Sequence, residues 1–353
     1  MKIAITADVH LTSYDNNPER FHAFENILDQ MDDRHIERLI IAGDLFDASC
    51  DNPAEFETLV SQEKFKHLTI HLLPGNHDPA LSTGTFTVRN IIYLTEPELI
   101  ELTQDTSLLF VPYKVETNMG EVLAAFEGEV DPAQWILIAH GDYLASTNLR
   151  NEYEPGSYMP LSRGEIQMYR PKKVFLGHIH LPFDSDILHY PGSPCGLDIS
   201  ETGIRSFLIY DTATNQVLRQ PIETDVIFFQ EVLTVLPLED EAAYLSKLLD
   251  QRVSAWGLNQ DQKDAVRARI VVQGYSSNRE AVLATIMDYM AQAGIQLIEP
   301  PDLGKVRVSD DRMRAEIVLS VQERLEELGL PDDSDEPGVD DYILSAMSQV
   351  YGG

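Results

Sequence analysis

Gly75-Asn76-His77-Asp78 is the stretch that decides how the rest of the chain is interpreted. It follows the apolar run Thr69–Leu73, whose β-branched and leucine residues before a Pro-Gly break indicate a buried strand that ends in a turn. Polar side chains at that point would lie on the carboxyl edge of an α/β sheet, where such sheets bind ligands. The stretch therefore predicts a functional loop.

Four other apolar runs of the chain end in polar clusters of the same kind. Residues two apart in an extended segment point the same way, so a cluster of the form Asp-x-His or His-x-His can direct two donors at one site. We therefore expect one shared site instead of five unrelated turns. The five strand ends supply Asp8 and His10, Asp44, Asn76 and His77, His140, and His178 and His180.

The donor types at these strand ends predict metal ions. Imidazole, carboxylate and amide oxygen suit first-row metals, and the lack of cysteine among these donors argues against a structural zinc site. There are too many donors for one ion. A carboxylate such as Asp44 can bridge two ions about 3.5–4 Å apart, the usual arrangement for phosphoester hydrolysis. We expect two divalent ions, with manganese as the first choice and Fe, Zn or Mg as alternatives.

The charge of the chain limits the substrates that it can bind unaided. A formal net charge of −32 opposes non-specific attraction to nucleic acid, which depends on cationic contacts to phosphates. Either the substrate is not a polyanion, or metals and a basic partner supply the positive charge; an acidic surface can also serve solubility alone. Two cysteines, no signal peptide and no apolar run of about 18 residues predict a cytoplasmic protein that does not enter a membrane.

The periodicity of the chain predicts an α/β fold of several layers. Strands are expected at residues 2–6, 39–42 and 69–73, with helices at 18–31 and 54–65 between them. Short strands at 91–93, 99–102 and 108–111, a helix at 121–126 and strands at 135–139 and 173–176 follow. We expect a layered α/β domain in residues 1–224.

A smaller α/β domain is expected in residues 225–328, with strands at 226–233 and 269–273 and helices at 241–256 and 279–293. Residues 329–353 are predicted to form an acidic linker and a short helix. In that helix Ile343, Leu344, Met347 and Val350 would line one face, which could dock a partner or pack on its own domain.

The order Asp-x-His, Gly-Asp, Gly-Asn-His-Asp, His and Gly-His-x-His resembles the calcineurin-like metallophosphoesterases. Within that superfamily, three stretches resemble the SbcD-type DNA-repair nucleases, relatives of the meiotic-recombination nuclease of archaea and eukaryotes. The stretches are Gly43-Asp44-Leu45-Phe46-Asp47, Gly177-His178-Ile179-His180, and Tyr190-Pro191-Gly192-Ser193-Pro194 followed by Glu201. The resemblance covers residues 1–221 with specific motifs and implies an α/β sandwich of two sheets flanked by helices. The smaller α/β domain occupies the place of the family's capping domain.

The resemblance implies a role for each donor. One ion would be held by Asp8, His10 and His180, the other by Asn76, His140 and His178, with Asp44 shared between them. The catalytic residues would be His77, as general acid or transition-state stabiliser, Asp78, which would orient His77, and Asp47. Asp47 stands where archaeal and eukaryotic relatives carry histidine, and bacterial members resemble this chain there.

The resemblance also implies partners and an activity. The chain would be an exonuclease, with endonuclease activity in addition, that acts on DNA in double-strand break repair with an SbcC-type coiled-coil ATPase. That ATPase would share the DNA binding, and the phosphoesterase domain would form a homodimer. A small-molecule phosphodiesterase or a protein phosphatase on the same metals is the enzymatic alternative, and a scaffold that retains only the fold is the non-enzymatic one.

Overall fold

The computed structural model describes residues 1–48, 53–79, 84–103, 105–132, 134–144 and 156–309, together with residues 320 and 324. The chain divides into two compact units. The first consists of Met1–Leu197 and Ile204–Val226, and the second of Asp198–Gly203 and the chain from Ile227 onward. Each unit has its own hydrophobic core.

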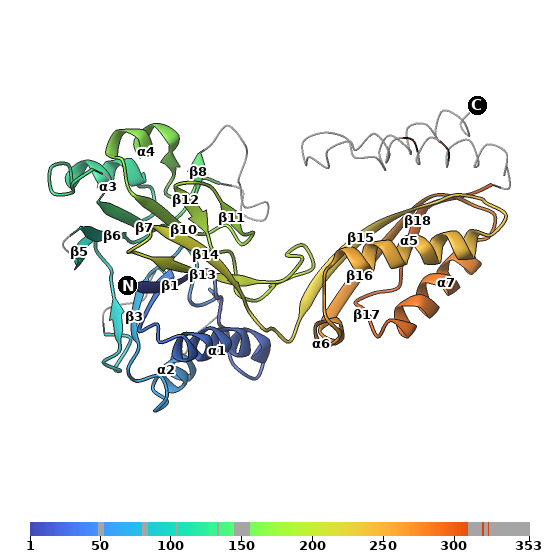
Figure 1. The fold of residues 1–353 in the computed structure, drawn as a ribbon, viewed down its shortest axis with the longest axis horizontal. Helices are drawn as coiled ribbons and strands as arrows, with labels where there is room; N and C mark the ends of the chain where they lie inside the picture. The colour runs from blue at the N-terminus through green and yellow to red at the C-terminus, as the bar shows by residue number, and fades with distance from the viewer. Residues whose placement is uncertain are drawn as a thin grey trace. The chain divides into compact units, whose positions relative to one another are not determined.

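Two six-stranded sheets form the centre of the first unit (Figure 1). The first sheet has the order β14-β13-β1-β2-β3-β4, and its strands β1 to β4 run parallel to one another. The hairpin of β13 and β14 adds to β1 in the antiparallel sense. The bounds are β1 Lys2–Thr6, β2 Arg38–Ala42, β3 Thr69–Leu73, β4 Ile91–Tyr93, β13 Ser206–Asp211 and β14 Gln216–Pro221.

The second sheet has the order β11-β12-β10-β7-β6-β5. Its four central strands are parallel, and antiparallel strands close both edges. The bounds are β5 Glu98–Thr103, β6 Thr106–Val111, β7 Trp135–His140, β10 Lys173–Gly177, β11 Phe183–Asp184 and β12 Leu188–Tyr190. A separate two-stranded ribbon joins β8 (Tyr143–Leu144) to β9 (Leu161–Ser162).

Helices cover the outer face of each sheet (Figure 1). Helices α1 (Pro18–Asp33) and α2 (Ala54–Val60) pack on the first sheet, while α3 (Met119–Ala125) and α4 (Arg163–Tyr169) pack on the second. Because side chains alternate along a strand, Leu39 and Ile41 of β2 lie under the helices, and Ile40 and Ala42 lie between the sheets. The first unit is therefore a four-layer α/β sandwich, and the expected fold class is confirmed.

Two helices of the first unit, α2 and α4, differ from the expectation. Helix α2 ends at Val60, not at residue 65, because the chain continues in turns. One of these turns is closed by a hydrogen bond from the Phe65 N–H to the Gln62 carbonyl (2.9 Å). The turns bury Phe65 without a further helical turn. Helix α4 was not expected, since it has only seven residues and includes a glycine. Its sequence signal is a capping box, in which the Ser162 side chain and Glu165 exchange hydrogen bonds with each other's backbone N–H.

The second unit is a small α/β layer pair. Its sheet has β16 at the centre, paired in parallel with β15, β17 and β18, and helices α5 and α7 contribute to its core. Alternate residues of β16 are buried, as expected for a sheet with one face under helices. The bounds are β15 Ile227–Val235, α5 Glu241–Ala255, α6 Gln260–Asp264, β16 Val266–Ser276, α7 Arg279–Gln292, β17 Gln296–Leu297 and β18 Asp302–Val308.

The helix expected at residues 342–350 and the acidic linker before it lie outside the described residues. Within the described part of the chain, no helix combines the length and the apolarity that crossing a membrane requires.

Candidate metal centre

All seven predicted ligands lie at or just beyond the carboxyl ends of central strands. In the first sheet Asp8 and His10 follow β1, Asp44 follows β2 and Asn76 follows β3. In the second sheet His140 ends β7, and His178 and His180 follow β10. Parallel strands place their carboxyl ends on one edge of a sheet, so each sheet gathers its own donors. Side chains from the two sheets contact one another: His10 lies next to His180, and Asn76 next to His140.

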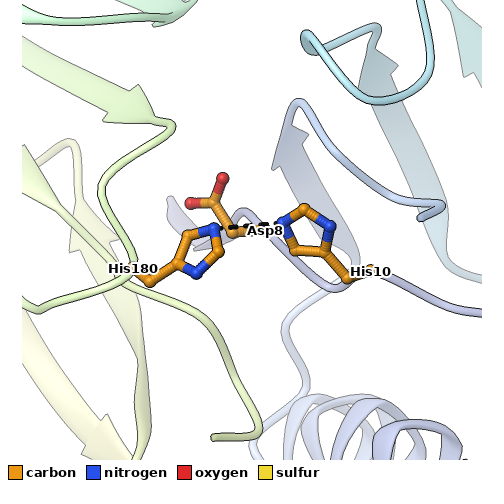
Figure 2. A group of neighbouring side chains, drawn as sticks. All are labelled: Asp8, His10 and His180. Carbon is orange, nitrogen blue, oxygen red and sulfur yellow. Dashed lines mark hydrogen bonds between the residues drawn. The ribbon is translucent and has the colours of Figure 1, made fainter. Parts of the chain in front are cut away.

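Asp8, His10 and His180 form the first group of donors (Figure 2). The Nε2 atoms of His10 and His180 are 3.1 Å apart, close to the roughly 3 Å expected between two neighbouring nitrogen ligands whose bonds to one ion are about 2.1 Å long. Oδ1 of Asp8 accepts a hydrogen bond from the His178 N–H (2.8 Å), whereas the buried Oδ2 has no hydrogen-bond partner among the described residues. A buried carboxylate oxygen in that state suits a metal ligand.

Asn76, His140 and His178 form the second group. Oδ1 of Asn76 lies 2.8 Å from Nε2 of His140 and 3.0 Å from Nδ1 of His178. Nδ1 of His140 donates a hydrogen bond to the Ala42 carbonyl (2.9 Å), which leaves the lone pair of the neutral ring on Nε2, facing the other donors. This is the arrangement that a histidine ligand of a metal requires.

Asp44 lies between the two groups. Its Oδ2 is 3.8 Å from Nε2 of His10 and 3.3 Å from Nε2 of His140, so one oxygen faces a donor from each group. Its Oδ1 accepts a hydrogen bond from the His77 N–H (2.8 Å), which fixes the orientation of the carboxylate. The residues present therefore fit two divalent ions with Asp44 in the shared position.

Four of the donors have a backbone conformation that is rare outside glycine. The φ angle is 54° at Asp8, 50° at His10, 51° at Asp44 and 97° at His178. Such conformations cost about 1–3 kcal/mol each, and they cluster at functional sites, where the surrounding structure enforces them. Gly177 lets the neighbouring backbone approach closely. A Cβ atom there would collide with the Ala42 carbonyl and with Nδ1 of His140, which are hydrogen-bonded to each other.

Burial and mutual charge set the protonation of the site. Burial raises the pKa of Asp8 to about 6 and lowers the pKa of His10 to about 3. Burial alone would lower the pKa of His140, but the Asp44 carboxylate outweighs it, with a smaller contribution from Asp8, and raises the pKa to about 9. Burial would likewise raise the pKa of Asp44, but His140 holds it below its usual range.

These protonation states predict how metal affinity depends on pH. Without metal, His140 keeps a proton up to about pH 9 and Asp8 up to about pH 6, and an ion that binds there must displace those protons. We expect the affinity for Mn²⁺ to rise about tenfold per pH unit between about pH 6 and 9, and more steeply below. Calorimetry in buffers of different ionisation enthalpy measures the protons released; release of none at pH 7.5 would contradict the prediction.

The three residues expected to be catalytic lie in different settings. The His77 ring is half-buried and meets the His10 ring edge to face, with 4.7 Å between the centroids. Both oxygens of Asp78 accept backbone hydrogen bonds, from the Gly75 N–H (2.7 Å) and the Phe46 N–H (3.1 Å). Asp78 thus joins the loop after β3 to the loop after β2. That Asp78 orients His77 stays a prediction.

Asp47 lies outside the two groups of donors. Its carboxylate is 32% exposed, and Oδ2 is 3.9 Å from Nη1 of Arg20. The same Arg20 atom donates a hydrogen bond to the carbonyl of His10 (2.5 Å). The position of Asp47 next to the backbone of a ligand allows an electrostatic effect on the site, since its charge raises the pKa of His10, although less than burial lowers it.

Sequence reasoning did not identify three side chains at the site. Asp142 is buried, with Oδ1 3.5 Å from Nε2 of His178, and its Oδ2 accepts a hydrogen bond from the Tyr158 N–H (2.7 Å). The Tyr158 ring is 4.7 Å from the His178 ring, and the Tyr113 ring is 6.1 Å from that of His140. Asp142 could have been identified from the sequence, because it ends the polar cluster His140-Gly141-Asp142. Neither tyrosine is part of a motif.

Comparison with known proteins assigns the larger part of the chain to a family. The model of the calcineurin-like phosphoesterase family matches residues 1–213, while no curated protein matches the chain. Two solved structures are similar to this chain, and each similarity covers 63% of this chain and 99% of the other. One is described as a novel archaeal phosphodiesterase, with 16% sequence identity and a TM-score of 0.35. The other is described only as a crystal structure, with 14% sequence identity and a TM-score of 0.42. The chain belongs to the calcineurin-like phosphoesterases, a family of hydrolases that use divalent metals.

Proposed function

We propose that this chain is a two-metal phosphodiesterase that hydrolyses the phosphodiester bonds of DNA, as an exonuclease with endonuclease activity, in double-strand break repair. The observation that carries the two-metal chemistry is the position of Asp44, whose Oδ2 faces His10 of one donor group and His140 of the other. A shared carboxylate between two groups of imidazole, carboxylate and amide donors is the usual protein framework for phosphoester hydrolysis.

In this proposal each residue of the site has a separate role in binding metal or in transferring a proton. Asp8, His10 and His180 would hold one ion, Asn76, His140 and His178 the other, and Asp44 both. When bound, two divalent ions acidify a water molecule and neutralise the charge on the phosphate. His77, at the edge of the first group, would protonate the departing oxygen. Nitrogen and oxygen donors suit several divalent ions, and among these we propose manganese as the native metal, with Fe, Zn or Mg as alternatives.

Two features support DNA as the substrate. The stretch Tyr190-Pro191-Gly192-Ser193-Pro194 resembles that of the SbcD-type nucleases. In addition, the half-buried rings of Tyr113 and Tyr158 lie 6.3 Å apart beside the second donor group, and aromatic rings at such a site can stack on nucleobases. Because the net charge of −32 opposes DNA binding, we propose that an SbcC-type ATPase shares it, and that the protein is a cytoplasmic homodimer.

Replacing Tyr158 by leucine tests the stacking. We expect kcat/KM for linear duplex DNA to fall about tenfold, since stacking on an aromatic side chain contributes about 1–3 kcal/mol per base. The same duplex with an abasic terminal nucleotide should be cleaved equally by both proteins. Tyr169→Leu, in α4, is the control variant. An equal loss on both substrates would mean that Tyr158 supports the fold and not the base.

The function itself is tested by a manganese-dependent nuclease assay on linear duplex DNA, with and without a candidate coiled-coil ATPase. We expect cleavage that requires Mn²⁺ and that the ATPase increases. An aryl phosphodiester is assayed in parallel. Hydrolysis of the aryl ester without any cleavage of DNA, in either condition, would overturn the proposal in favour of a small-molecule phosphodiesterase or a protein phosphatase. The acidity of the chain favours that alternative, since a small substrate needs no basic groove.

A further inference from the structure

Arg205 is a buried arginine that is not itself a metal donor. It lies just before β13, and only 1% of its surface is exposed. Its Nε donates a hydrogen bond to the Ser193 carbonyl (2.9 Å), and its Nη2 donates to the Ser193 Oγ (2.6 Å) and to the carbonyl of His180. The guanidinium therefore contacts the backbone of a predicted metal ligand directly.

The backbone of His180 depends on contacts of this kind. His180 lies in the irregular segment after β10, where no strand pairing fixes it. Its carbonyl accepts a second hydrogen bond from the Ser193 N–H (3.0 Å). Gly192, with φ of +78°, lies so close that a Cβ atom there would collide with the same carbonyl. Gly192 and Ser193, in the stretch that resembles the SbcD-type nucleases, thus contact the His180 carbonyl. Arg205 joins Ser193 to His180.

We propose that Arg205 is a positioning residue, which holds His180 where its Nε2 can share an ion with Asp8 and His10. This inference rests on the proposed two-metal function. The guanidinium is suited to the task because Nε and Nη2 form a rigid planar fork that reaches Ser193 and His180 together. A residue that supports one ligand of one group should affect one ion and leave the other unchanged.

Arg219 provides a matched control. It donates hydrogen bonds to the carbonyls of Tyr190 (2.9 Å) and Pro191 (2.8 Å), so it holds the same stretch a few residues earlier. It also pairs with Asp184, with Nε 2.9 Å from Oδ2. Among the described residues, none of these hydrogen bonds reaches His180, so the loss of Arg219 should disturb the stretch without moving the ligand.

The test is a calorimetric titration of the metal-free full chain with Mn²⁺, with bound metal counted by elemental analysis. We expect two sites in the original protein. In Arg205→Met one site should be weakened about 10- to 100-fold, the usual loss when the support of a ligand is removed, and the other should stay within about twofold. Arg205→Lys, whose ammonium can still reach His180, should recover part of the loss, and Arg219→Met should keep both sites.

Each result decides the inference. Equal weakening of both sites in Arg205→Met, or two unchanged sites, would overturn it. If that variant does not fold, Gly192→Ala replaces it, because the added methyl group would push on the His180 carbonyl; there too, the loss must fall on one site. An original protein that binds fewer than two ions would instead overturn the proposed function, so the two failures are distinguishable.

Discussion

Replacing Asp44 by asparagine is expected to lower kcat for phosphodiester hydrolysis by on the order of 10³-fold, equivalent to about 4 kcal/mol of transition-state stabilisation. The Asp44 Oδ2 faces Nε2 of His140 at 3.3 Å and Nε2 of His10 at 3.8 Å, so it is the oxygen that both ions would share. Asparagine keeps the size and an oxygen that can accept the His77 N–H, but it removes the charge that a bridging ligand supplies.

The same variant should lose metal in a measurable way. We expect elemental analysis to find fewer than two ions per chain, and the melting temperature of the metal-free protein to show that the fold is retained. Asp29→Asn is the matched control, because Asp29 is 48% exposed and, within the described part of the chain, forms an ion pair with Lys64 at the surface and not with any residue of the site. Full activity of Asp44→Asn in Mn²⁺ would remove the proposed mechanism, since the loss depends on the position of Asp44 alone.

Replacing His77 by alanine is expected to leave both ions bound and to slow the cleavage of DNA by about 10²- to 10⁴-fold, the usual contribution of a general acid. His77 is half-buried at the edge of the first donor group, where its ring meets that of His10. An aryl phosphodiester, whose leaving group is weakly basic, should be hydrolysed at a nearly unchanged rate because it does not need the proton. The ratio of the two rates is therefore the decisive measurement.

The structure also defines what would refute this role. His10, Asp44 and His77 each offer an atom within 4.8 Å of the others, so His77 is close enough to be a ligand. Loss of an ion in His77→Ala, with equal losses on DNA and on the aryl ester, would assign it as one. His67→Ala is the control, because His67 is 43% exposed on a turn, with Nε2 3.5 Å from an Asp32 oxygen.

The main features of the fold, and the strand ends at which the candidate ligands lie, were predictable from the sequence because they depend on local patterns. A short apolar run before Pro-Gly predicts the buried strand β3. The observed bounds of this strand, Thr69–Leu73, agree with the expected ones. Parallel strands open on one edge, so polar clusters that follow them can be assigned to one site without knowing the fold in detail. This rule brings Asp8 and Asp44 together, because they follow neighbouring strands of one sheet. His140 ends a strand of the other sheet and joins them because the two sheets pack face to face.

Only the tertiary structure decided how the site is supported. The contact of Arg205 with His180, the attachment of Asp78 to Phe46 and the placement of Tyr113 and Tyr158 join segments that are distant in sequence or lack any motif. The physical reason is that periodicity records which face of an element is buried, but not which partner it meets. Ligands could be recognised by their type and spacing, whereas the residues that hold them depend on how the two sheets and their loops pack.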